Sequence, residues 1–128
     1  MRVLIIDDEE SIRKMTAMLL EDLGHETVGV ENRAGALAQL DKSLFDVAFL
    51  DLKLNGESGL DLLPELLKSH PHMDVIVCTA YASIETAVEA MKRGATDYLP
   101  KPFTPDKLVQ AVQSCITCGS GAQNRIAT

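Results

Sequence analysis

The sequence lacks three features that would direct a chain to a membrane, to the cell exterior or to nucleic acid. Its longest apolar runs are far shorter than the ~18 residues that a membrane-spanning helix needs. Its 3 cysteines are an odd number and do not suggest a disulfide framework. The 12 basic residues are outnumbered by 19 acidic ones and form no basic patch. We therefore expect a cytoplasmic protein that binds neither membranes nor nucleic acid directly.

The sequence also lacks the usual signals for secretion and for nucleotide binding. Its start, MRVLIIDD, has a short apolar run that two acids interrupt, unlike a signal peptide. It has no P-loop, and no Gly-rich or Ser/Thr-rich loop follows the first apolar run, which argues against flavodoxin-type cofactor binding. With 128 residues, 46% of them apolar, we expect one domain with a real core.

Short apolar runs alternate with segments of helical periodicity along the chain. The runs that begin at Val3, Val47 and Val75 are apolar enough for strands buried on both faces, while those at 27–30 and 97–99 resemble edge strands. Alternation of this kind predicts βα units in an α/β fold. With right-handed crossovers it predicts a doubly wound, flavodoxin-like sheet of five parallel strands in the order 2-1-3-4-5, with five helices.

Each expected helix has a predicted inward face and, in most cases, a cap. Asn32, Ser58 and Ser83 are predicted N-caps, and Gly24 and Gly94 are predicted to end helices. Pro64 lies inside the third helix, where it removes one hydrogen bond. The predicted inward residues, helix by helix, are Ile12, Thr16, Leu19 and Leu23; Ala34, Leu37 and Leu40; Leu60, Leu63, Leu66 and Leu67; Ile84, Ala87, Val88 and Met91; and Leu108, Val112, Cys115 and Ile116.

Polar residues follow the expected strands at the edge where parallel sheets bind ligands. Asp7 and Asp8 follow the first strand, Asp51 the third, Thr79 the fourth and Lys101 the fifth. Each has a local explanation as a helix cap, a strand end or a loop residue. Together they form a cluster of carboxylates that needs a cation, and an oxygen-only set suits Mg²⁺ better than zinc.

With these residues the chain resembles the receiver domain of two-component response regulators over about residues 2–117, and residues 1–117 are expected to form that domain. Gly56 and Gly59 match the loop after the acceptor Asp of that family, and the stretch 94–103, GATDYLPKPF, is similar to receivers of the nitrogen-regulator type, which precede a sigma-54-activating ATPase. Leu54-Asn55 stands where many members have Met-Pro, which we expect to alter the loop and leave the chemistry intact.

The resemblance implies a phosphorylation switch rather than a turnover enzyme, with self-dephosphorylation as an accompanying property. Asp51 would accept a phosphoryl group from a histidine kinase. Mg²⁺ would be held by Asp8, Asp51 and the backbone carbonyl of Lys53, with Asp7 acting through water. Lys101 would neutralise charge, and a cis peptide would precede Pro102.

The same resemblance implies how the signal leaves the site. Thr79 and Tyr98 would be the switch pair, and the surface made by the fourth helix, the fifth strand and the last helix would change. That surface would form a homodimer or contact output domains, an ATPase and a DNA-binding domain in a full-length protein. Residues 118–128 would be a linker or tail.

Two alternative functions remain open from the sequence. A Mg²⁺-dependent phosphatase of the haloacid-dehalogenase kind also uses an Asp nucleophile, but it carries D-x-D-G-T where this chain has Asp7-Asp8-Glu9-Glu10-Ser11. A receiver fold that only docks, without phosphorylation, commonly lacks part of the site. The Cys115 and Cys118 pair cannot by itself complete a four-ligand zinc site, and Cys78 and Cys115 are predicted core residues.

Overall fold

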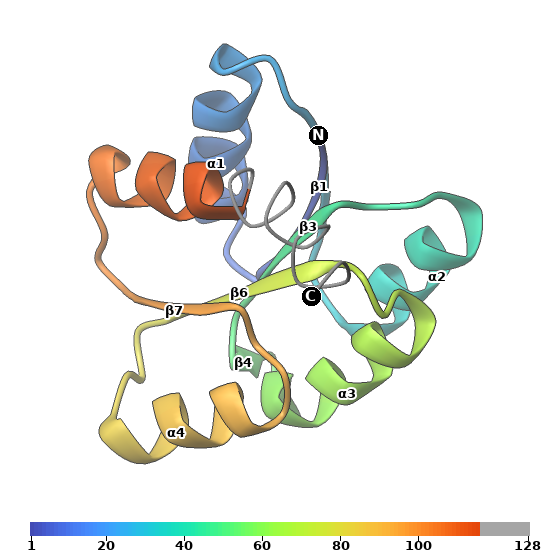
Figure 1. Ribbon diagram of the computed structural model, residues 1–128, viewed down its shortest axis with the longest axis vertical. Helices are drawn as coiled ribbons and strands as arrows, with labels where there is room; N and C mark the ends of the chain where they lie inside the picture. Colours follow the sequence, from blue (N-terminus) through green and yellow to red (C-terminus); the bar gives the residue numbers. More distant parts are fainter. Residues whose placement is uncertain (116–128) are drawn as a thin grey trace, which may run out of the picture.

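The computed structural model describes residues 1–115 and has a five-stranded parallel sheet at its centre (Figure 1). The strand order is β2-β1-β3-β6-β7, which confirms the predicted order of the five expected strands. The strands are β1 (Arg2–Ile6), β2 (Glu26–Val30), β3 (Val47–Leu50), β6 (Asp74–Thr79) and β7 (Asp97–Pro100).

Helices cover both faces of the sheet, as the predicted doubly wound fold requires (Figure 1). Helix α1 (Glu10–Asp22) and the last helix (residues 105–115) share one face. Helices α2 (Arg33–Lys42), α3 (Gly59–Ser69) and α4 (Ile84–Lys92) lie on the other. Within residues 1–115, no helix is long and apolar enough to cross a membrane.

Strand β3 explains why the central runs are continuously apolar. Its alternate side chains enter two separate cores: Val47 and Phe49 pack with α1 and the last helix, while Ala48 and Leu50 pack with α2 and α3. Both sets are buried. A strand covered on both faces must be apolar at every position, so its first charged residue marks the point where the strand leaves the core.

The strand register brings the strand ends to one edge. Ile6 lies opposite Leu50, and Leu50 lies opposite Val77. The next residues along β1 and β3 are Asp7 and Asp51, and the backbone N–H of Asp51 donates to the carbonyl of Ile6 at 3.0 Å. Parallel pairing therefore places the two carboxylates side by side at the carboxyl edge of the sheet.

A small hairpin after β3 was not predicted as a pair of strands. It consists of β4 (Lys53–Leu54) and β5 (Glu57–Ser58), paired antiparallel. The turn between them is Asn55-Gly56, with φ of 48° and 87°. Positive φ at both turn residues is the geometry that two-residue hairpins require and that Asn-Gly favours, so the turn predicted from this dipeptide is confirmed.

The predicted inward faces are wrong in part for three helices. In α1 Thr16 is buried as predicted, together with Leu20, while Leu23 is exposed. In α2 Leu40 is buried as predicted, but Ala34 is exposed and Ala36 is buried instead. In α4 only Ala90 is buried, and Ile84, Val88 and Met91, which we expected to face inward, are exposed. Periodicity identifies an apolar stripe, but the placement of the helix on the sheet decides whether that stripe is covered. The buried face predicted for the last helix is confirmed at Leu108, Val112 and Cys115; Ile116 lies outside the described residues.

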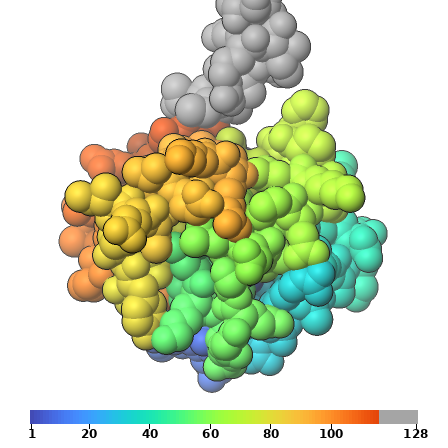
Figure 2. Space-filling model, turned by 90° about the horizontal axis from the view of Figure 1, so that it is seen from below, coloured from blue at the N-terminus to red at the C-terminus, as the bar shows by residue number. Residues whose placement is uncertain are grey.

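Helix α4 is held mainly at its two ends, beside α3 on the surface (Figure 2). At its start, the side chain of Ser83 accepts the N–H of Thr86 and the side chain of Thr86 accepts the N–H of Ser83, a capping box. At its end, Arg93 donates to the carbonyl of Leu60 at 2.8 Å. Leu60 is four residues before Pro64, which has no N–H for that carbonyl, so Arg93 fills the place of the missing helical bond.

We expect the cap of α4 to contribute measurably to stability because so little of the helix is buried. Ser83→Ala should lower the free energy of unfolding by about 1 kcal/mol, and Ser83→Gly by only a few tenths. Urea denaturation of the two variants measures the difference. Equal stability of wild type and Ser83→Ala would show that the cap does not hold α4.

Candidate functional site

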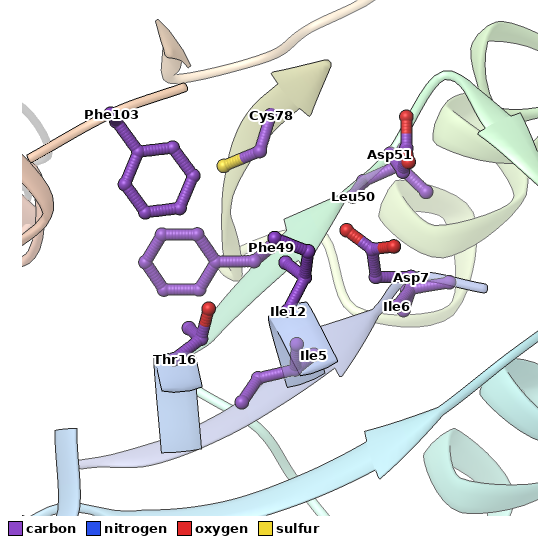
Figure 3. A pocket seen from close by; sticks show the side chains of 10 residues that line it. All are labelled: Ile5, Ile6, Asp7, Ile12, Thr16, Phe49, Leu50, Asp51, Cys78 and Phe103. Atoms are coloured by element: carbon purple, nitrogen blue, oxygen red, sulfur yellow. The ribbon is translucent and has the colours of Figure 1, made fainter. Parts of the chain in front are cut away.

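Three carboxylates meet at the carboxyl edge of the sheet. One oxygen from each of Asp7, Asp8 and Asp51 lies within 4.8 Å of the others. Figure 3 shows the side chains of Asp7 and Asp51 pointing toward one another from the ends of β1 and β3. Asp7 and Asp51 are buried and Asp8 is half-buried. The cluster predicted from strand order is therefore present in the structure.

Lys101 bridges two of the acids. Its Nζ lies 2.6 Å from Asp7 Oδ2 and 3.0 Å from Asp51 Oδ2, and the lysine side chain is 7% exposed. Burial lowers the pKa of Lys101, but the hydrogen bonds to Asp7 and Asp51 outweigh it and leave the pKa raised, so the ammonium stays charged. The peptide bond to Pro102 is cis, as the family resemblance predicts.

Every polar group of Asp7 has a partner. Its N–H donates to the carbonyl of Val30, its carbonyl accepts from Arg13, its Oδ1 accepts the N–H of Glu9 at 2.9 Å, and its Oδ2 accepts from Lys101. The residue at the N-cap of α1 is Glu9, which makes no side-chain cap. Asp7 is thus bonded into the site rather than serving as the N-cap of α1.

Asp51 is held less completely than Asp7. Its Oδ1 accepts the backbone N–H of Lys53 at 3.2 Å, and its Oδ2 accepts from Lys101. A Cβ built on Gly59 would lie 2.1 Å from the carbonyl oxygen of Asp51, so the chain after Asp51 packs against the start of α3 with no room for a side chain. The predicted importance of Gly59 therefore has a steric basis.

The site has a closed apolar floor and an open mouth. The floor holds a cavity of only about 10 Å³, lined by Asp7, Asp51 and apolar residues that include Phe49, Cys78 and Phe103 (Figure 3). The mouth is an open depression of about 440 Å³, lined by Asp8, Glu9, Asp51, Lys53, Asn55, Gly56, Ala80 and Tyr81. Asp51 lines this depression, so a ligand can reach Asp51 from the mouth.

The apolar floor affects the charge of Asp7. Burial raises the pKa of Asp7 above its ordinary value, and the hydrogen bonds from Lys101 and Glu9 oppose that effect without cancelling it. Burial also raises the pKa of the Cys78 thiol well above its usual range. Cys78 is therefore a protonated core residue and not a nucleophile, as predicted.

Thr79 is the last residue of β6, and Tyr98 lies on the neighbouring strand β7. Thr79 is buried, and its Oγ1 accepts the N–H of Tyr81 at 3.0 Å. Tyr98 is half-buried, and its hydroxyl shares a hydrogen bond of 2.7 Å with Thr86 Oγ1 in α4. Because Thr86 also belongs to the capping box, Tyr98 is linked directly to the start of α4.

Two contacts at the mouth were not predicted from the sequence. The N–H of Asn55 donates to Asp8 Oδ2 at 3.1 Å, a bond that a proline at this position would not form. Lys53 Nζ lies 4.5 Å from the centre of the Tyr81 ring. The sequence did carry a signal for the first contact, because Asn55 replaces the proline that many family members have at this position. It carried no signal for the contact between Lys53 and Tyr81.

The donor set fits a hard divalent cation. It offers only oxygen ligands from closely spaced carboxylates, which suits Mg²⁺, and the open mouth leaves room for the waters that this ion keeps. Two carboxylates about 4 Å apart repel by ~1 kcal/mol in water and by more in a less polar site. Lys101 already offsets part of this repulsion through its ion pairs with Asp7 and Asp51, and a bound cation would offset more of it.

The raised pKa of Asp7 predicts a pH-dependent stability in the metal-free protein. The folded state binds this proton more tightly than the unfolded chain, so the contribution of Asp7 is full below its ordinary pKa of 3.8 and is lost as pH rises through the folded value. We expect the free energy of unfolding of wild type to fall relative to Asp7→Asn across that window. Urea denaturation in EDTA at a series of pH values measures it, and a constant difference between the two proteins would contradict the expected titration.

The sequence matches the family model described as response regulator receiver domain over residues 3–113. It is 41% identical to the alginate biosynthesis transcriptional regulatory protein AlgB of Pseudomonas aeruginosa over 107 residues, which are 84% of this chain and 24% of that protein. It is 37% identical to the DNA-binding transcriptional regulator NtrC of Escherichia coli over 115 residues, 90% of this chain and 24% of that protein. The chain thus spans about a quarter of the length of these relatives.

Similarity to solved structures agrees with the sequence match. A response regulator protein from Burkholderia pseudomallei, solved with a phosphorylated aspartic acid, a calcium ion and citrate, superposes with a TM-score of 0.83 at 34% identity, covering 96% of this chain and 74% of that one. The family model covers most of the chain, and the fold and the acidic cluster are those that the motifs predicted. The chain belongs to the response regulator receiver domain family of two-component systems, and its relatives include regulators of the nitrogen-regulator type.

Proposed function

We propose that Asp51 accepts a phosphoryl group from a histidine kinase and that this modification switches the surface around α4. The observation that carries the proposal is the position of Asp51, a buried carboxylate bonded to Lys101 at the base of an open depression that Asp8 also lines. Transfer forms a bond from an Asp51 oxygen to phosphorus and breaks the phosphorus–nitrogen bond of the kinase phosphohistidine.

Asp51 suits this role better than its two acidic neighbours. Asp7 has every polar group bonded and does not line the mouth. Asp8 lines the mouth, but Lys101, the cation of the site, bonds to Asp7 and Asp51 instead. Asp51 both lines the mouth and accepts from Lys101, and its other oxygen accepts the backbone N–H of Lys53.

The charges around Asp51 favour transfer of an anionic group. Bound Mg²⁺, held by Asp8, Asp51 and the backbone carbonyl of Lys53, with Asp7 acting through water, would supply charge neutralisation at the phosphoryl oxygens. Lys101 is already charged and within hydrogen-bonding distance of Asp51, so it can follow the new negative charge without crossing the site. The cavity below Asp51 is small and is lined mostly by apolar side chains.

We expect acetyl phosphate with Mg²⁺ to add one phosphoryl group to the wild-type chain and none to Asp51→Asn. Asp46→Asn is the matched control, because Asp46 is an exposed acid at the opposite end of β3 and the substitution changes charge equally. Intact-mass measurement counts the added groups. Undiminished labelling of Asp51→Asn would refute the assignment, and absence of labelling in wild type would favour the docking-module alternative.

The switch that we propose uses Thr79 and Tyr98. A phosphoryl group on Asp51 adds acceptor oxygens toward which the hydroxyl of Thr79 can donate. Movement of Thr79 would free space for Tyr98, whose present bond to Thr86 would then be lost. Loss of that bond would also disturb the capping box, so the modification would reach α4 through hydrogen bonds that the described residues already make.

The partners that we propose follow from the exposed surface and from the relatives. Ile84, Val88 and Met91 form an exposed apolar stripe on α4, next to β7. This stripe, with β7 and the last helix, would form a homodimer or contact output domains, which in relatives such as NtrC lie outside the region that this chain matches. The output would be a transcription-activating ATPase with a DNA-binding domain.

We expect Thr79→Ala to be phosphorylated on Asp51 yet to transmit little change to α4. The missing hydroxyl removes the group that would follow the phosphoryl oxygens, while Lys101 and Asp51 remain. Amide chemical shifts of α4 and β7, recorded before and after acetyl phosphate treatment of wild type and variant, measure the response. Shifts in the variant as large as those in wild type would exclude Thr79 from the switch.

A further inference from the structure

Strand β2 contains a residue that the fold alone does not explain. Gly29 lies inside the strand, opposite Ile5 of β1, although glycine weakens a strand interior. A Cβ built there would lie 3.4 Å from Cδ of Arg13, 3.7 Å from its Cβ and 3.8 Å from its Nε. The stem of the arginine therefore runs across β2 at the place where the strand has no side chain.

The arginine crosses the strand to reach the acidic site. Arg13 lies in the first turns of α1, and its Nη1 donates to the backbone carbonyl of Asp7 at 2.7 Å. Asp7 lies just beyond the last residue of β1, Ile6, so its carbonyl has no place in the sheet ladder. A charged donor at this distance makes a strong hydrogen bond, and a guanidinium keeps its charge at any ordinary pH.

The hydrogen bond from Arg13 to the carbonyl of Asp7 adds a further contact that holds the turn containing Asp7 and Asp8 in place. Asp7 is held at its N–H by Val30 and at its side chain by Glu9 and Lys101, so the carbonyl bond from Arg13 leaves none of its polar groups unbonded. Asp8 follows immediately, and its orientation depends on the peptide unit that Arg13 holds. We propose that Arg13 is a positioning residue for cation binding by Asp7 and Asp8, and that Gly29 provides the space it needs.

The proposal rests on the cation site of the proposed function. For removal of the Arg13 charge, it predicts a change in Mg²⁺ affinity opposite in direction to the change that Coulomb forces alone would cause. Removal of a positive charge close to a cation site should strengthen Mg²⁺ binding if only Coulomb forces act. Removal of a group that orients the ligands should weaken it, and loss of comparable outer contacts weakens metal binding about 10-fold or more. The direction of the change therefore separates the two effects.

The first experiment compares Arg13→Met with Lys14→Met in a Mg²⁺ titration followed by NMR. Lys14 is the next residue in α1, is exposed and pairs only with Glu10 on the helix surface, so its loss reports the charge effect alone. We expect Arg13→Met to weaken Mg²⁺ binding roughly 10-fold. We expect Lys14→Met to leave it unchanged or slightly tighter. Equal or tighter binding by Arg13→Met would overturn the proposal.

The second experiment tests the role of Gly29 with two substitutions of different size. The Cβ of an alanine makes an ordinary contact with Arg13, whereas the branched side chain of a valine would occupy the path of the arginine stem, even though valine favours strands. Gly29→Ala should bind Mg²⁺ like wild type, and Gly29→Val should show the loss seen in Arg13→Met. The double variant Arg13→Met/Gly29→Val should lose no more Mg²⁺ affinity than either single variant does. Additive losses of affinity would contradict a shared mechanism.

A readout in the metal-free protein separates this proposal from the proposed function. The N–H of Glu9 donates to Asp7 Oδ1, so its hydrogen exchange reports the order of the acidic turn. We expect faster exchange at Glu9 in Arg13→Met and Gly29→Val and not in Lys14→Met; unchanged exchange in the first two would overturn the positioning role. If Asp51 takes up no phosphoryl group while these differences hold, the proposed function fails and the role of Arg13 stands.

Discussion

The burial of Asp7 and Asp51 beside one another is the constraint on which the rest of the site depends. Parallel pairing of β1 with β3 forces these acids together, because the residues before them, Ile6 and Leu50, are opposite in the sheet. The cavity below them is small and is lined mostly by apolar side chains. Lys101 is the compensating group, and it arrives from the loop after β7, on the far side of β6. Loss of Lys101 would leave two buried carboxylates without their compensating charge.

The surroundings of the three acids differ in a way that suits a division of labour. Asp7 is held by four different partners, and burial raises its pKa. Asp51 keeps access to the mouth, and Gly59 lets its backbone pack tightly against α3. Asp8 is tied to the hairpin turn through Asn55. In the proposed switch, a charge change at the mouth would therefore act first on the loop, since the base of the site is held by more hydrogen bonds.

Helix α4 has two features that the proposed switch requires, a small buried area and hydrogen-bonded ends. Its only buried residue is Ala90, and hydrogen bonds at its two ends take the place of a packed face. One end is connected through Thr86 to Tyr98, and the other, through Arg93, to the carbonyl that Pro64 leaves unbonded in α3. Elements with few buried contacts have low local stability and are those that move most readily. The exposed apolar stripe on the same helix would then be presented differently in each state.

Much of this architecture was predictable from local patterns. Apolar runs ending in acids identified the central strands and Asp51, and the Asn-Gly dipeptide identified the turn that proved to be a small hairpin. These features are determined by a few neighbouring residues, because strand burial on both faces and positive φ impose direct requirements on residue type. The strand order followed from the same runs together with the handedness of the crossovers.

Long-range placement was decided only by the tertiary structure. The sequence alone indicated an apolar stripe on α4, but it did not show that this stripe is exposed. The face of a helix that is buried depends on how the chain places that helix against the sheet. It contained Gly29 and Arg13 without revealing that they meet, since residues 16 positions apart come together only when α1 packs on β2. The sequence determined which residues carry the chemistry; the packing of helices on the sheet determined which others hold them in position.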